Sequence, residues 1–292
     1  MLDLFWQAVG AGLLIGGVAW GYRRWVAPHR GLNAQGKGLV MLIALTFIGG
    51  FIGSPFWWLD LIQSFAWDLP PLASRMLAAA GWSFAVVCWI ALQRPTTRRA
   101  QLVLILLAVY LAPLVSAIFL FHLDRFDYTA PLTYGFFIIA GGITVAALWY
   151  LWRQSKTITD DELDLQPSPA LVKGWLIALA AVTALWGLAL FLTDSGLTDL
   201  IWVWPGDLLT SRLIGVMLLA IAAGSAFSLR YADTSRMMLW MSLTYGLGLA
   251  IASLWGVLAG SAIMVSYAVV FGLIFVGSIV ALMVQRHRRD NF

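Results

Sequence analysis

Two short segments of this chain combine tryptophan, serine and arginine at the same spacing. The first is WDLPPLASR at residues 67–75, and the second is WPGDLLTSR at residues 204–212. The planar guanidinium of arginine offers a fork of N–H donors that matches a carboxylate or a phosphate, and a serine hydroxyl beside it can donate or accept. These residue types indicate recognition of an anion. The candidate ligand-binding residues are Arg75, Arg212, Trp67, Trp204, Ser74 and Ser211.

A structural role would explain the same residues. Each arginine has an aspartate in its own segment, Asp68 or Asp207, with which it could pair. Each serine stands where its hydroxyl could accept a free N–H of the first turn of the following helix. The tryptophans could belong to the aromatic belt at the membrane interface. The sequence leaves both roles open.

Residues for other kinds of chemistry are sparse. The histidines His29, His122 and His287 and the single cysteine, Cys88, form no cluster with metal-ligand spacing. The sequence also lacks the P-loop, GxSxG and HExxH motifs. We therefore predict no catalytic residue, no metal and no cofactor. An intramembrane enzyme that uses exported aspartates, with His122 as acid or base, is kept as an alternative.

The composition defines the elements that must position these side chains. Of the 292 residues, 61% are hydrophobic and 11% are charged, and the mean hydropathy is +0.87. Soluble domains carry about 25% charged residues. About 20 apolar residues in a helix cross the hydrocarbon core of a bilayer, and such runs recur along the whole chain. The sequence therefore predicts an all-α polytopic integral membrane protein.

We expect about nine transmembrane helices. The apolar runs lie at residues 4–22, 38–56, 72–92, 100–122, 131–152, 171–192, 209–229, 237–258 and 262–284. The period-two alternation typical of membrane β-strands is absent from them.

The basic residues predict the orientation. Segments 23–37, 93–99, 153–173, 230–236 and 285–289 hold all but three of the 18 lysines and arginines. Because these segments alternate with the other connections, the positive-inside rule places them in the cytoplasm. The N-terminus is then outside and the C-terminus is cytoplasmic. Short loops and the absence of an N-x-[ST] acceptor favour a bacterial plasma (inner) membrane.

An internal repeat accounts for the two matching segments. Trp67 and Trp204 are separated by 137 positions, and the same offset pairs Ser74 with Ser211. We interpret these matches as one extra N-terminal helix followed by two four-helix repeats. An even number of crossings per repeat makes the repeats parallel, so that a pseudo-two-fold axis runs along the membrane normal.

The predicted organisation has five parts. Residues 1–37 form the N-terminal transmembrane helix and a cytoplasmic loop, and residues 38–154 form repeat 1. An acidic cytoplasmic linker at 155–169 leads to repeat 2 at 170–287, and 288–292 form a cytoplasmic tail.

We weighed three functions on this basis. The favoured one is a non-catalytic membrane protein that binds or transports a small or amphipathic molecule, anionic or lipid-like, at the repeat interface near the outer leaflet. The alternatives are an accessory subunit of a larger membrane complex and the intramembrane enzyme named above. The expected partners are the lipid bilayer, other membrane subunits, and an anionic lipid or small solute. No basic, aromatic-studded surface indicates nucleic acid.

Overall fold

The computed structural model is all-helical in the part of the chain that it describes. That part comprises residues 2–29, 31–61, 65–153, 165–193, 207–259 and 265–290. Its long helices are α1 (Leu2–Gly21), α2 (Ala34–Trp58), α3 (Pro71–Gln93), α4 (Thr97–Phe121), α5 (Pro131–Arg153), α6 (Ala170–Leu192), α7 (Leu208–Ser228), α8 (Ala232–Leu258) and α9 (Val265–Asp290). Two short helical segments, η1 (Tyr22–Val26) and η2 (Leu123–Arg125), follow α1 and α4.

Eight of these helices, α2 to α9, are long and apolar enough to cross a membrane. This agrees with the predicted class of helical membrane protein. The first helix, α1, lies where the sequence predicts it but is not among those eight. We call the end of the bundle that the sequence predicts to be external the outer end, and the opposite end the inner end.

Several helices begin earlier than their apolar runs do. The start of α2 at Ala34 precedes the predicted start at 38, because the side chain of Asn33 accepts a hydrogen bond from the Gly36 N–H at 2.8 Å. In α4, Thr96 accepts from the Arg99 N–H at 3.4 Å. Polar N-caps of this kind lie outside the apolar run that hydropathy detects.

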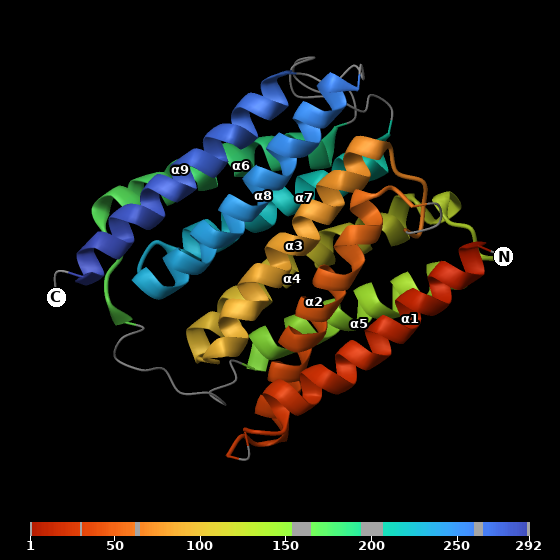
Figure 1. Cartoon of the computed structure of the whole chain (residues 1–292), viewed down its shortest axis with the longest axis horizontal. Coiled ribbons are helices and arrows are strands. Elements are labelled where there is room, and N and C mark those ends of the chain that lie inside the picture. The colour runs from red at the N-terminus through yellow and green to blue at the C-terminus, as the bar shows by residue number, and fades with distance from the viewer. Residues whose placement is uncertain are drawn as a thin grey trace.

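The helices pack as antiparallel pairs, and one helix of each of four pairs belongs to a central group. Consecutive helices pair as α2 with α3, α4 with α5, α6 with α7 and α8 with α9, while α1 lies against α2 (Figure 1). The most extensive contacts between different pairs are those of α3 with α8 and of α4 with α7. The most apolar stretch is 78% buried in α7 and 67% buried in α3, but only 22% in α5. The core therefore lies among α3, α4, α7 and α8.

Glycines allow two of the pairs to approach closely. A Cβ on Gly50 of α2 would lie 2.5 Å from the carbonyl oxygen of Gly81 in α3. A Cβ on Gly187 of α6 would likewise lie 2.8 Å from the carbonyl oxygen of Gly215 in α7. Small residues at such positions let helix backbones come into contact in lipid.

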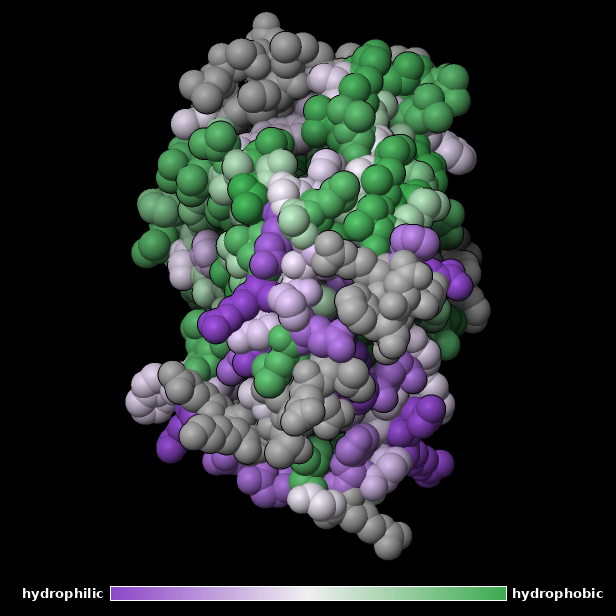
Figure 2. Space-filling view, turned by 90° about the vertical axis from the view of Figure 1, so that its left-hand side faces the viewer, coloured by the Kyte–Doolittle hydropathy of each residue, from purple (hydrophilic) through white to green (hydrophobic). Residues whose placement is uncertain are grey.

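The surface divides into apolar and polar regions. In the view from the side of the C-terminus, hydrophobic residues gather in the upper part and hydrophilic residues in the lower part (Figure 2). Large apolar side chains such as Ile138, Val145 and Leu185 are strongly exposed on their helices. Exposed apolar surface of this extent is expected where lipid, not water, is the solvent.

An ion pair joins two central helices at the inner end. Arg99 of α4 donates from Nε and Nη2 to the two carboxylate oxygens of Asp233 in α8, at 2.7 and 2.6 Å. Its Nη1 also donates to the carbonyl oxygens of Ile90 and Arg94. The two side chains are only 12% and 17% exposed. This bidentate pair fixes α4, α8 and the α3–α4 turn together.

The end of the predicted linker is bound to the bundle. Ser168 N–H donates to the Arg230 carbonyl at 3.4 Å, and Ala232 N–H donates to the Gln166 carbonyl at 2.8 Å. The hydroxyl of Ser235 donates to that of Ser168. Residues 165–169 therefore form part of the inner end, whereas 154–164 lie outside the described residues.

Candidate functional site

Arg212 is held at the outer end by groups from two other helices. Its Nε donates to the carbonyl of Phe191, near the end of α6, at 3.2 Å. Its Nη1 lies 2.7 Å from Nε2 of His122, the residue that caps α4. The guanidinium also lies over the Phe121 and Phe191 rings, with centroids at 5.0 and 5.7 Å. Arg212 thus ties α7 to α4 and α6.

Asp207, the acid in the same segment, makes other contacts. Its carboxylate accepts hydrogen bonds from the N–H and the hydroxyl of Thr210 and so caps α7. It also forms a long ion pair with Arg125 at 3.8 Å. Asp207 therefore serves as a helix cap and does not supply the hydrogen bonds that hold Arg212.

Arg75 is held far less tightly than Arg212. Its guanidinium lies over the Trp255 ring of α8, 5.7 Å from the centroid. Within the described part of the chain it has no hydrogen bond or ion pair, so its predicted partner Asp68 does not bind it. The side chain is half-buried. Arg75 and Arg212 therefore differ in the contacts that they make with the described residues.

The expected N-capping by the two serines is wrong. The Ser74 hydroxyl donates to the carbonyl of Trp57 at the end of α2, 2.7 Å away. The buried Ser211 hydroxyl has no hydrogen-bond partner among the described residues, and Asp207 is the residue that caps α7. At the first segment, the serine therefore links α3 to the preceding helix, as Arg212 links α7 to α6.

Trp67 lies inside the protein and not in an interfacial belt. It is 6% exposed and packs edge-on against Phe65, Phe126 and Phe136, with ring centroids 4.4, 5.3 and 5.6 Å away. We call these four residues the outer aromatic cluster. The cluster fixes the segment before α3 to α5 and to the α4–α5 connection. Trp204 lies outside the described residues.

The surroundings of His122 favour the neutral form of its ring. Burial and then the charge of Arg212 lower the pKa of His122 from its ordinary value of 6.5; Arg125 adds to this, while Asp124 and Asp207 oppose it. A neutral ring can accept a hydrogen bond from the Arg212 guanidinium at Nε2. Because the folded-state pKa is lowered, this stabilisation is fully present above about pH 6.5 and is lost as the pH falls through the lowered pKa.

This contact predicts a pH-dependent stability. Lowering the pH from about 7.5 to about 5 should lower the melting temperature of the wild-type protein in detergent. Arg212→Gln should lose less on acidification, because the Arg212 guanidinium then no longer opposes protonation of His122, and His122→Asn should remove this component. Arg75→Gln is the matched control and should keep the wild-type dependence. The same loss in all four proteins, measured by thermal unfolding, would contradict the assignment.

A small cavity lies between α3 and α7. Its lining residues Met76 and Leu213 directly follow Arg75 and Arg212 in the sequence. Its volume is about 10 Å³, which is roughly the space of one water molecule. Its lining consists of Met76, Leu77, Ala80, Tyr110, Leu213, Ile214, Met217 and Tyr245. We call it the central cavity.

The lining of the central cavity follows the 137-residue offset. Met76, Leu77 and Ala80 of α3 match Leu213, Ile214 and Met217 of α7 position by position. Two tyrosines, Tyr110 of α4 and Tyr245 of α8, complete it. Neither hydroxyl forms a hydrogen bond within the described residues, although Tyr245 is only 1% exposed. The polar groups at this position are therefore available to a ligand or water.

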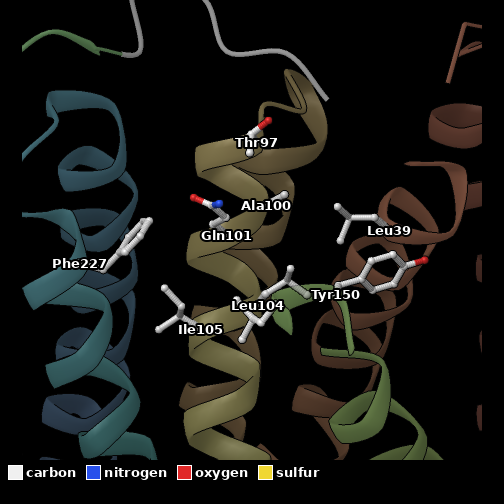
Figure 3. A pocket seen from close by; sticks show the side chains of 9 residues that line it. Leu39, Thr97, Ala100, Gln101, Leu104, Ile105, Tyr150 and Phe227 are labelled. Carbon is white, nitrogen blue, oxygen red and sulfur yellow. The ribbon is translucent and has the colours of Figure 1, made fainter. Parts of the chain in front are cut away.

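A larger cavity opens at the inner end, with a volume of about 350 Å³. It lies between α2, α4, α5 and α7 (Figure 3). Its lining consists of Leu39, Thr97, Ala100, Gln101, Leu104, Ile105, Tyr150, Leu151 and Phe227. We call it the inner cavity. It lies at the opposite end of the bundle from the site that the sequence predicts.

Sequence reasoning missed the groups that line the cavities. Each of the polar cavity residues Tyr110, Tyr245 and Gln101 is isolated within an apolar run. Of the three, only Tyr245 stands out in the sequence, because it lies in a glycine-containing stretch around Gly246. Asp233 could have been found as the acid among arginines in the segment 230–236. No group of three or more His, Cys, Asp or Glu side chains able to hold a metal occurs among the described residues.

The fold defines the class of the protein. Eight apolar helices of membrane-spanning length, packed around a buried core, make it a helical integral membrane protein. Comparison with known proteins found no matching family model, curated protein or solved structure. Any more particular function must therefore be argued from the site itself.

Proposed function

We propose that this protein binds a small or amphipathic molecule between two four-helix repeats, near the outer leaflet, and transports it without catalysis. The observation that carries the proposal is the central cavity. It combines matched apolar residues from α3 and α7 with two tyrosine hydroxyls that have no hydrogen-bond partner in the described chain. Apolar walls with a few convergent polar groups are typical of ligand sites.

Helix packing supports the duplication. Helices α2 to α5 form one proposed repeat and α6 to α9 the other. The most extensive contacts between them are α3 with α8 and α4 with α7, which a two-fold relation would exchange, and smaller contacts join α3 to α7 and α4 to α8. Gly50 and Gly187 also lie 137 positions apart, and each contacts a glycine carbonyl of the following helix. Parallel repeats related in this way place a cleft on the axis between them.

The charges favour an anionic molecule. Arg75 lies in the first turns of α3 with its guanidinium over Trp255 and without a hydrogen-bond acceptor among the described residues, whereas Arg212 is already held by Phe191 and His122. We propose that Arg75 meets the anionic group and that Arg212 maintains the structure. The proposed setting is a bacterial plasma membrane, with the N-terminus outside and the C-terminus in the cytoplasm.

In this structure the central cavity has space for only about one water molecule. Binding a larger molecule therefore requires the proposed repeats to separate at the α3–α7 contact. Rocking of one repeat against another is the usual motion of transporters with internal repeats.

Cysteine accessibility tests this proposal without a known substrate. Met76→Cys and Leu213→Cys are made in a Cys88→Ala background, since Cys88 is the only cysteine. In reconstituted vesicles, both new thiols should react with a small methanethiosulfonate reagent from the outer side, at least tenfold faster than a buried control. Val87→Cys is the matched control, because Val87 is fully buried elsewhere on α3.

The other outcomes identify the alternatives. Protection of Met76→Cys and Leu213→Cys equal to that of Val87→Cys would overturn the transport proposal. A stoichiometric partner retained in mild detergent, together with such protection, would favour an accessory subunit of a membrane complex.

A further inference from the structure

The inner cavity is separate from the central one and shares no lining residue with it. We propose that it holds one acyl chain of an anionic phospholipid from the leaflet at the inner end, with the lipid phosphate next to Arg153. Three features of the molecule support this site: the polarity of the cavity wall, the residues at the matching position in the other half of the chain, and the surface onto which the cavity opens.

The wall changes from polar to apolar with depth. Along α4 it runs from Thr97 at the inner end to Ile105, a rise of about 12 Å. Gln101 contributes an amide that has no hydrogen bond within the described residues, and Leu104 and Ile105 continue the wall toward the membrane centre. A phospholipid has the same order of groups, with an ester above a hydrocarbon chain.

The remaining walls are apolar. Leu39 of α2, Leu151 of α5 and Phe227 of α7 surround the α4 face (Figure 3). Tyr150 presents its ring, while its hydroxyl points toward α2 and donates to the Gln35 carbonyl at 3.2 Å. The amide of Gln101 is therefore the side-chain group best placed to bind an ester carbonyl.

The other half of the chain fills the corresponding position. At an offset of 137 residues, Ala100, Gln101 and Leu104 correspond to Met237, Met238 and Met241. All three methionines are fully buried. Methionine is a flexible residue that fills irregular gaps in a core. An open cavity is therefore not an unavoidable consequence of this helix arrangement, and small or polar residues keep it open on one side only.

The cavity lies next to the lipid-facing surface. Leu148 and Trp152 of α5 flank the wall residue Leu151 and are 46% and 77% exposed. Arg153 ends α5 as an exposed cation, stacked on the Trp149 and Trp152 rings. A guanidinium at this level matches a lipid phosphate, and the adjoining apolar surface lets a chain enter from the bilayer.

Photo-crosslinking tests the site on the intact protein. The protein is placed in phosphatidylglycerol nanodiscs that contain a phosphatidylglycerol with a diazirine in its acyl chain, and crosslinked peptides are mapped. We expect crosslinks on the peptides that carry Leu104, Ile105 and Phe227, which are buried or half-buried, above those on the exposed α5 residue Ile138.

Two variants distinguish binding of the acyl chain from binding of the lipid headgroup. Ala100→Met copies the side chain found 137 positions later and should lower these crosslinks at least fivefold, whereas the lipid-facing control Val145→Met should not. Arg153→Gln should remove the preference for phosphatidylglycerol over phosphatidylcholine and leave chain entry intact.

Wild-type protein alone can refute the proposal, so it does not depend on the folding of Ala100→Met. Crosslinks on Leu104 and Phe227 no stronger than on Ile138 would overturn it. A second outcome would assign the cavity to soluble amphiphiles and not to phospholipids. In that case a soluble detergent-like amphiphile at low concentration would abolish the crosslinks, and native mass spectrometry would detect no retained phospholipid. Neither result affects the cysteine test of the central cavity.

Discussion

Asp233→Asn is expected to lower the free energy of unfolding by about 3 kcal/mol, because it leaves the Arg99 guanidinium without its counter-ion in a mostly buried position. The two carboxylate oxygens of Asp233 accept both hydrogen bonds from Arg99, and an amide keeps one acceptor and adds a donor facing the cation. Reversible unfolding in mixed micelles with increasing dodecyl sulfate measures the change.

Two comparisons isolate the ion pair in this experiment. Arg125→Gln breaks the exposed pair with Asp207 at the outer end, where the arginine side chain is 48% exposed, and should cost less than about 1 kcal/mol. The double variant Arg99→Gln with Asp233→Asn should recover part of the loss, because it leaves no unpaired buried charge. Equal effects of Asp233→Asn and Arg125→Gln would show that the inner pair is not stabilising.

The helices could be predicted from the sequence because a membrane crossing needs only a long apolar run. Which face of each helix contacts lipid and which contacts the protein core could not be predicted in the same way, since lipid and core are both apolar. Leu102 is fully buried in α4, whereas Leu185 of α6 is 73% exposed. Nothing in the residue type separates the two leucines.

The site was harder to predict because its contacts join distant helices. The repeated Ser-Arg segments single out Arg212, but its partner His122 is 90 positions away in the sequence. Arg75 occupies the matching position and has different neighbours, with Trp255 beneath its guanidinium. A sequence repeat indicates equivalent backbone positions, but the partners of each side chain depend on residues that the repeat does not preserve.

The α2–α3 contact predicts the other large effect. Gly50→Ala is expected to lower the free energy of unfolding by about 2 kcal/mol, because its Cβ would lie 2.5 Å from the Gly81 carbonyl oxygen, a backbone atom that cannot rotate away. The helices would have to separate, and the Ser74 hydroxyl bond to the Trp57 carbonyl would lengthen with them. Unfolding in mixed micelles again measures the loss.

Gly49→Ala is the matched control, one residue away on the same helix. A Cβ on Gly49 meets no atom within 4 Å, so this variant should be neutral or slightly more stable, since alanine favours helix over glycine by up to about 1 kcal/mol. Gly187→Ala should reproduce the Gly50→Ala loss at the α6–α7 contact, where the Cβ would lie 2.8 Å from the Gly215 carbonyl oxygen. If Gly50→Ala and Gly49→Ala unfold alike, the two helices are not in backbone contact there. A loss at Gly50 without one at Gly187 would instead mean that the two helix pairs are built differently, which would weaken the proposed duplication.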